Sequence, residues 1–313
     1  GYDNRPLYNS VDSSLLLFEQ VKKYLDYTSD YDFVMKEIYP KLEEIIVNYT
    51  NGIDLDDNNI YLDADGLIVS GTQFTQNTWM DAKYDGKAIT PRNGKVVEIN
   101  ALWYNALRIM ADLENKIGKK ANSKQYKELA ERTKLSFIDK FYNKKRKCLF
   151  DVVGDSKIRP NQLFALSLTY TVVDCDSEMA KNIFEVVTKK LLNNYGLKTL
   201  AKGEENYVEI YEGDGARRDF SYHQGITWTW LLGLYYNALK KLVYPALMFI
   251  EMAVKNFTLE QIVPKMKDKS IDNIYKTKMN DKITVEEVIA KVKELFDFDE
   301  VIDVEVIDSL KEV

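Results

Sequence analysis

The chain has 313 residues, 45% of them hydrophobic and 29% charged, a globular composition that excludes bulk disorder and collagen-like structure. Its net charge of −6 and the lack of a basic stripe argue against a nucleic-acid partner, because phosphate binding needs clustered Lys and Arg. No apolar run is long enough to cross a bilayer, and with only 14 Gly and 6 Pro the chain is predicted to be mostly helical.

Helical spacing of apolar residues predicts two helices near the N-terminus. The first runs over about 12–27, and the second runs from the turn at 28–30 to about Tyr49, with a kink expected at Pro40. A polar stretch at 51–95 follows. Connections of this length usually carry function, so a site is expected to draw on it.

Helices are next predicted at 97–117 and 123–142, then at about 161–171 and at 177–193. A second long polar loop at 194–222 precedes an aromatic-rich helix predicted at 223–241. The character of the chain then changes. Further helices are predicted at 244–263 and 283–296, and the segment 300–313 is acidic.

The predicted helices come in pairs, with short turns inside a pair and long polar loops between pairs. This pattern favours a toroid of helical hairpins whose long loops gather on one face and form a site there. A helical solenoid is the competing interpretation, but no fixed repeat of 20 to 50 residues is found. We expect a toroid-like domain at 1–242 and a divergent helical tail at 243–313.

All four Trp lie in polar contexts: Trp79, Trp103, Trp228 and Trp230 have acids, amides or His223 as sequence neighbours. Aromatic faces stack on the apolar CH face of a pyranose ring, and nearby polar side chains bind its hydroxyls. The pattern therefore favours a sugar site. Core packing of these aromatic residues is the alternative interpretation.

Glycoside hydrolysis needs two carboxyl groups across one bond, one of them a protonated acid. Asp81 is the best candidate acid, because its apolar neighbours in the segment 78–83 would raise its pKa. The alternative is a loop acid paired with Lys83.

Other residues offer weaker signals. His223 is predicted to open a helix, where the ring and free backbone N–H groups reach a ligand, or else to serve as a structural hydrogen bonder. The segment 63–66 has part of a calcium-loop pattern but lacks the series that ends in Glu, so no metal is expected. The distant Cys148 and Cys175 indicate a reducing compartment and a cytoplasmic location.

Several segments together resemble one family. They are YNSVDSSL (8–15), DADGLI (63–68), TWMDAK (78–83), TPR (90–92), KVVEINALWYNAL (95–107), IRPNQ (158–162), YGL (195–197), YEGD (211–214) and YHQG (222–225), with Trp228 and Trp230. In this order they are similar to the glucosidase domain of glycogen debranching enzymes.

The resemblance implies an (α/α)6 toroid, incomplete at both ends, with amylo-α-1,6-glucosidase activity. It also implies inverting hydrolysis of α-1,6-linked glucose at branch points of glycogen or limit dextrin, Asp81 as the general acid, and no cofactor. A subset of the residues in the matching pocket motifs is expected to bind substrate: Asp12, Trp79, Lys83, Arg92, Glu98, Asn100, Trp103, Asn105, Arg159, Asn161, Gln162, Glu212, Asp214, His223, Gln224 and Trp228.

The chain departs from the family pattern after about residue 242. Neither the Ser-Glu-Ile-type motif that holds the family's general base nor its Gln-Ala-Trp-Ser run is found, so the base is unassigned. A fragment, a replaced C-terminal end, or a base supplied by a tail acid would each account for this. The alternative functions are a catalytically inactive glucan-binding domain and a glucoamylase-like or trehalase-like enzyme on the same scaffold.

Overall fold

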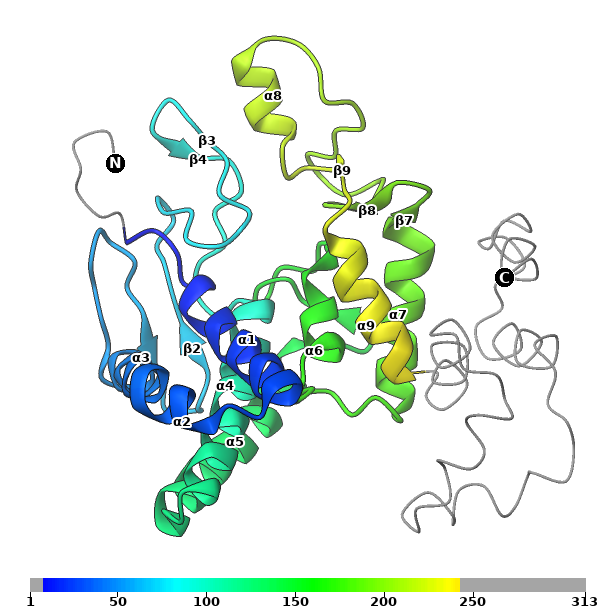
Figure 1. Cartoon of the computed structure of the whole chain (residues 1–313). Helices are drawn as coiled ribbons and strands as arrows, with labels where there is room; N and C mark the ends of the chain where they lie inside the picture. The colour runs from blue at the N-terminus through cyan, green and yellow to red at the C-terminus, as the bar shows by residue number, and fades with distance from the viewer. Residues whose placement is uncertain (1–7, 243–313) are drawn as a thin grey trace, which may run out of the picture. The chain divides into compact units, whose positions relative to one another are not determined.

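The computed structural model describes residues 8–242, which form a helix-rich fold with a few small sheets (Figure 1). The prediction of a mainly helical chain is confirmed for this part. The elements predicted beyond residue 243 lie outside the described residues. No helix in the described part is long and apolar enough to span a membrane.

The first predicted helix is confirmed as α1 (Ser13–Thr28), which buries Leu15, Phe18 and Leu25 at helical spacing and ends where Ser29 adopts a left-handed conformation. The second is interrupted. It consists of α2 (Tyr31–Phe33), a π-helical turn (Val34–Ile38) and α3 (Tyr39–Asn51). Pro40 lies in the first turn of α3 and has no N–H to donate to the preceding turn, which accounts for the break.

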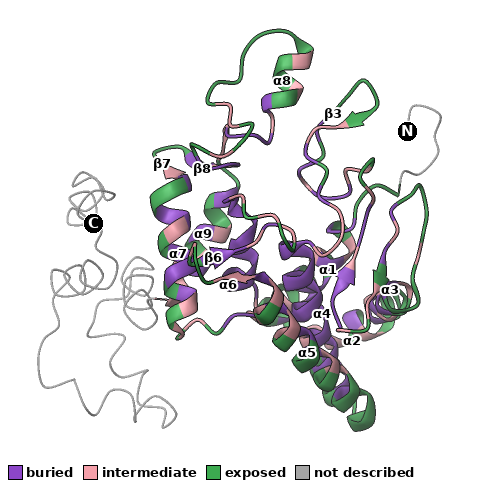
Figure 2. Ribbon diagram, turned by 180° about the vertical axis from the view of Figure 1, so that it is seen from behind, coloured by how far each residue is buried: buried purple, intermediate pink, exposed green. Residues whose placement is uncertain are grey.

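A predicted pair of antiparallel helices forms the centre of the fold. Almost every residue of α4 (Val97–Lys116) is buried, whereas α5 (Lys120–Phe141) buries one narrow face that includes Ala130, Phe137 and Phe141. Figure 2 shows this contrast between the two helices. Because α4 packs against α5 on one side and α1 on another, its polar residues lie inside the protein.

The predicted helix at 161–171 is shorter than expected. A 3₁₀ turn (Pro160–Leu163) leads into α6 (Phe164–Ser167), and the chain is extended at Leu168. The backbone N–H of Thr169 donates to Glu19 and that of Tyr170 donates to Asn105. These side-chain acceptors replace the helical hydrogen bonds that the local sequence favours.

The next helix is confirmed as α7 (Glu178–Leu191), which begins where the Ser177 side chain accepts from the N–H of Ala180. The predicted helix at 223–241 begins later than expected, as α9 (Leu231–Leu242). The prediction that His223 opens a helix is therefore wrong. His223 instead follows α8 (Gly215–Ser221), a short helix within the predicted loop.

Short antiparallel strands, which the sequence did not predict, shape the long loops. The stretch 51–95 holds the pairs β1 (Tyr61–Leu62) with β2 (Ile68–Val69) and β3 (Lys83–Tyr84) with β4 (Lys87–Ala88). The strands β5 (Tyr142–Asn143) and β6 (Cys148–Leu149) pair, and β7 (Leu192–Asn193), β8 (Gly196–Lys198) and β9 (Thr227–Trp228) form one sheet.

The two long loops come together in space. The helix α8 contacts β3, and both lie at the same end of the described structure (Figure 1). The Gln224 side chain of one loop donates to Thr90 Oγ1 of the other, over 3.2 Å. The convergence of the polar loops, expected from the sequence, places the candidate site between them.

Candidate functional site

Trp79 is the centre of an aromatic cluster built from both loops. Its ring lies edge-on to His223 at 5.3 Å, to Trp228 at 6.3 Å and to Trp230 at 4.9 Å between ring centroids. The indole N–H of Trp79 donates to Asn161 Oδ1 over 2.8 Å. Trp79 of the first long loop thus packs against three rings from the segment 223–230, which is distant in sequence.

The aromatic cluster continues to the other side of Trp228. The Trp228 ring stacks on His223 at 5.8 Å and lies edge-on to Tyr222 at 4.9 Å, and Tyr222 contacts Tyr211. Trp230 and Tyr211 are 45% and 48% exposed, and Trp79, Trp228 and Tyr222 are partly exposed. A surface of this kind can stack on a sugar, which a fully buried core cannot do.

Trp103 belongs to the core instead. It is fully buried on α4 and stacks on Tyr49 at 6.1 Å. The sequence grouped it with the other three tryptophans, and the structure separates it from them.

Asp81 lies two residues after Trp79 and is exposed at the surface. The surrounding protein atoms partly desolvate its carboxyl and raise its pKa, and the negative charge of Asp12 raises it further. No ion pair joins Asp81 to Lys83 within residues 8–242. Asp81 therefore combines access to a ligand with a raised affinity for a proton, which is the requirement for a general acid.

Asp12 is held near this loop by the start of α1. The backbone N–H of Val11 donates to the carbonyl of Asn77 over 2.8 Å, and the Ser10 hydroxyl donates to Asp12 Oδ1 over 2.7 Å. Asp12 is 8% exposed. A second carboxyl group is thus fixed close enough to Asp81 to affect its proton affinity.

Behind the aromatic cluster lies a buried charged network. The Arg92 guanidinium binds both oxygens of Glu98, with Nη2 at 2.6 Å from Oε2. It also binds Asp151, with Nε at 2.6 Å from Oδ2 and Nη2 at 2.9 Å from Oδ1. Burial opposes the charged form, but the two carboxylates outweigh it and raise the pKa of Arg92.

Arg159 attaches the second loop to this network. It donates to the carbonyls of His223 and Thr199 over 2.7 and 3.1 Å, and to Gln224 Oε1 over 3.0 Å. Burial lowers the pKa of the Arg159 guanidinium. The turn that carries His223 and Gln224 is therefore held by a buried cation rather than by a helix.

His223 is buried and neutral. Desolvation and the positive charges of Arg159 and Arg92 lower its pKa to about 3. Its Nδ1 atom makes no hydrogen bond within the described part of the chain. At neutral pH the ring therefore offers an uncharged polar face beside Trp79 and Trp228.

Other residues of the matching motifs support the backbone. The Asn100 amide exchanges hydrogen bonds with the backbone of Ile68, the Asn105 amide donates to Glu19, and Gln162 Oε1 accepts from the N–H of Leu149.

Glu212 and Asp214 are exposed near the start of α8, where Asp214 accepts from the N–H of Arg217. Asp63 and Asp65, from the calcium-loop pattern, both bind Lys95 Nζ, at 2.6 and 2.5 Å. Among the described residues no group of three or more His, Cys, Asp or Glu side chains is placed to hold a metal ion.

Sequence reasoning missed Asp151. This residue follows β6 in a short loop, and nothing in its local sequence distinguishes it from a surface acid. It is 3% exposed and joins Arg92 to Asn161. Only the contact with these distant residues identifies it.

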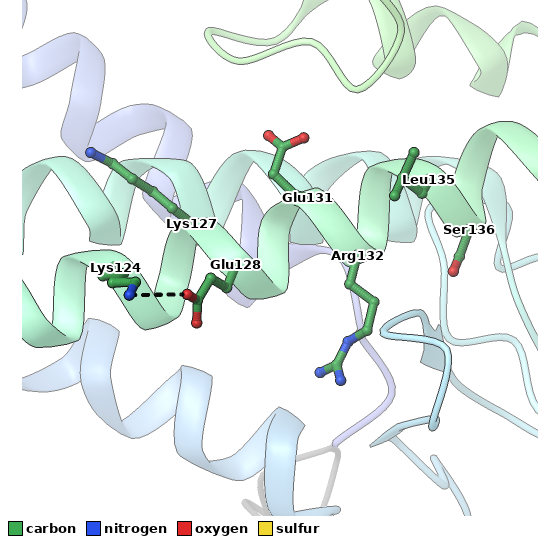
Figure 3. A pocket seen from close by; sticks show the side chains of 7 residues that line it. All are labelled: Lys124, Lys127, Glu128, Glu131, Arg132, Leu135 and Ser136. Atoms are coloured by element: carbon green, nitrogen blue, oxygen red, sulfur yellow. Dashed lines mark ion pairs between the residues drawn. The ribbon is translucent and has the colours of Figure 1, made fainter.

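An open cavity of about 640 Å³ lies elsewhere, along α5. Figure 3 shows that its seven lining side chains all come from this helix, with Lys124 and Glu128 paired across one turn. The lining side chains are mostly charged and include no aromatic ring. The candidate site is therefore the surface around Asp81 and the aromatic cluster.

Comparisons with known proteins agree with the resemblance. Residues 1–301 match the family described as amylo-alpha-1,6-glucosidase, so the match extends beyond residue 242. The glycogen debranching enzyme of Saccharomyces cerevisiae is 25% identical over 221 residues, which cover 55% of this chain. The chain spans only 14% of the length of that relative.

A solved sialidase structure has a similar fold, with a TM-score of 0.54 and 13% identity. The likeness covers 76% of this chain and 20% of the sialidase. At 13% identity this similarity is evidence about the fold only. The family match covers most of the sequence, and the chain therefore belongs to the amylo-alpha-1,6-glucosidase family.

Proposed function

We propose that this chain is a glycoside hydrolase that releases α-1,6-linked glucose at branch points of glycogen or limit dextrin. The observation that carries the proposal is the raised pKa of the exposed Asp81 carboxyl beside a partly exposed aromatic cluster. Family membership supports the substrate class. The scaffold we propose is an (α/α)6 toroid, to which the antiparallel α4–α5 pair would contribute one hairpin.

In the proposed reaction, Asp81 is protonated and donates its proton to the oxygen of the glycosidic bond as that bond breaks. A water molecule attacks the anomeric carbon from the opposite face and inverts its configuration. A carboxylate that activates this water would lie about 6.5–9.5 Å from Asp81 in an inverting enzyme. We assign no residue to this role.

The remaining residues divide into two proposed roles. Trp79 and Trp228 stack on the glucose ring, and the polar side chains at the surface bind its hydroxyls. We propose that substrate is contacted by Trp79, Lys83, Glu212, Asp214 and Trp228, with the buried Asp12 and His223 directly beneath them. The surrounding structure is held by Arg92, Glu98, Asn100, Asn105, Arg159, Asn161, Gln162 and Gln224, and Trp103 packs in the core.

The raised pKa of Asp81 favours hydrolysis over glucan binding without catalysis. A raised pKa assists proton donation, whereas a carboxylate that only accepts hydrogen bonds from hydroxyls gains nothing from it. We also propose a cytoplasmic location, because Cys148 is a free, buried thiol.

The test is glucose release from phosphorylase limit dextrin by the purified chain. Asp81→Asn removes the proton donor and is expected to lower kcat by about 10²- to 10⁴-fold. Asp85→Asn removes an exposed carboxyl from the same loop and is expected to keep wild-type turnover.

Wild-type turnover by Asp81→Asn would refute the assignment of the acid. Binding of limit dextrin by the folded wild-type chain, without any glucose release, would identify a binding domain instead. Parallel assays with α-1,4- and α,α-1,1-linked substrates separate the proposed enzyme from a glucoamylase-like or trehalase-like one.

A further inference from the structure

The buried carboxylate of Asp151 lies directly behind the aromatic cluster. It accepts hydrogen bonds from Arg92 and, through Oδ1, from Asn161 Nδ2 over 2.8 Å. The Arg159 Nε atom lies 3.6 Å from Asp151 Oδ2. Asp151 is thus surrounded by three polar side chains from two separate segments of the chain, the long loop that carries Arg92 and the turn that carries Arg159 and Asn161.

The Asn161 amide lies between two groups of opposite hydrogen-bonding character. A carboxylate paired with arginine only accepts hydrogen bonds, and an indole N–H only donates. Because Asp151 faces the amide, the Nδ2 atom of Asn161 must point toward it. The Oδ1 atom then points toward Trp79 and accepts its indole N–H over 2.8 Å. With the amide turned over, donor would face donor and acceptor would face acceptor.

This orientation determines where the Trp79 ring lies. Its indole N–H is anchored to Asn161, and its ring faces and edges contact His223, Trp228 and Trp230. We propose that Asp151 is a positioning residue that fixes the Trp79 ring through the Asn161 amide. The consequence for sugar binding rests on the function proposed above, but the effect on the ring does not.

The direct test observes the Trp79 indole N–H by ¹⁵N nuclear magnetic resonance. The chain has four Trp, and Trp79→Phe assigns the signal. Asp151→Asn keeps the shape of the side chain but allows it to donate hydrogen bonds as well as accept them. The Asn161 amide is then no longer restricted to the orientation in which its Oδ1 atom faces Trp79. We expect the Trp79 signal to shift and its exchange with solvent to become faster.

Asp155→Asn is the matched control, because it removes a carboxyl from the same loop. Asp155 accepts from the N–H of Lys157 and pairs with its ammonium. It has no hydrogen bond to Asn161. We expect the Trp79 signal of this variant to match the wild type.

The kinetic test measures limit-dextrin hydrolysis. Asp151→Asn is expected to raise KM about tenfold, the effect of losing one charge-assisted hydrogen bond, with a smaller change in kcat. In a Trp79→Phe background, which already lacks the indole N–H, the same substitution should leave KM unchanged. A purely structural role would instead raise KM by the same factor in both backgrounds.

A second variant keeps the proposal testable if Asp151→Asn does not fold. Asn161→Leu removes the acceptor from Trp79 but leaves the Arg92–Asp151 pair, and it should produce the same change of the Trp79 signal. An unchanged Trp79 signal in the folded variants would overturn the proposal. A wild-type chain without hydrolytic activity would refute only the proposed function, since the resonance measurement needs no substrate.

Discussion

At the scale of single residues, His223 shows how a local environment changes the chemistry of a side chain. The turn that holds it is surrounded by aromatic rings and by the cations Arg92 and Arg159. These surroundings disfavour a second proton on the ring. His223 is therefore a neutral group under all ordinary conditions and does not act as a cationic ligand for the substrate.

This depressed pKa makes the stability of the fold depend on pH. The pKa of His223 is about 3 in the folded chain and 6.5 in the unfolded chain. Between these values the unfolded state binds a proton that the native state excludes, so the free energy of unfolding falls as the pH drops below 6.5. The contribution of this one group is at most about 1.4 kcal/mol per pH unit.

Urea denaturation at pH 7, 6 and 5 measures this dependence for the wild type and for His223→Gln. We expect the difference in the free energy of unfolding between the two proteins to change with pH. The variant lacks the titrating ring of His223, whereas both proteins share all other titrating groups. Parallel pH profiles would contradict the assignment.

At the scale of elements, the pairing of β8 with β9 decides the position of Trp228. Leu197 pairs with Trp228 in the register of these strands. Gly196 has a φ of +150°, and a Cβ atom there would lie 2.6 Å from the carbonyl oxygen of Trp228. The close approach of the two strands therefore requires glycine at this position.

Gly196→Ala is expected to destabilise the fold by about 1–3 kcal/mol, because the strand must move or the backbone must strain. Weaker glucan binding should accompany the change, since Trp228 moves with β9. Gly215→Ala at the start of α8 is the control, because a Cβ atom there meets nothing within 4 Å. Thermal unfolding compares the two, and equal effects would contradict this view of β8 and β9.

At the scale of the whole described structure, the Arg92 network ties the polar loops to the helical core. Glu98 belongs to the first turn of α4, Asp151 follows β6, and Arg92 belongs to the long loop that also carries Trp79. All three side chains are at least 96% buried. The loop is therefore anchored by buried charges as well as by its buried apolar side chains, such as Leu67 and Met80.

Arg92→Met is expected to cost about 3–5 kcal/mol of stability, because two buried carboxylates lose their partner. Lys22→Met removes a partly exposed cation that pairs with Asp26 and should cost no more than about 1 kcal/mol. Chemical denaturation of both variants measures the difference. Similar losses would show that the network contributes little to the fold.

Local sequence patterns predicted the structure correctly where residues close together in the sequence determine it. The helices α1, α5 and α7 follow from apolar spacing, since each buries one side against the core, and α4 is predicted correctly although almost all of it is buried. The prediction of a helix from His223 was wrong, because Gly225 adopts a φ of +139° and Thr227 and Trp228 pair with β8. Strand pairing between distant residues outweighed the local preference.

The sequence by itself determined the family of this protein and the helix-rich character of its described part, since composition, apolar spacing and motifs can be recognised without the tertiary structure. Only the tertiary structure decided that Trp103 lies in the core, that His223 is buried beside two cations, and that Asp151 joins Arg92 to Asn161. These roles arise from burial and from contacts between segments far apart in the chain, which no local pattern encodes.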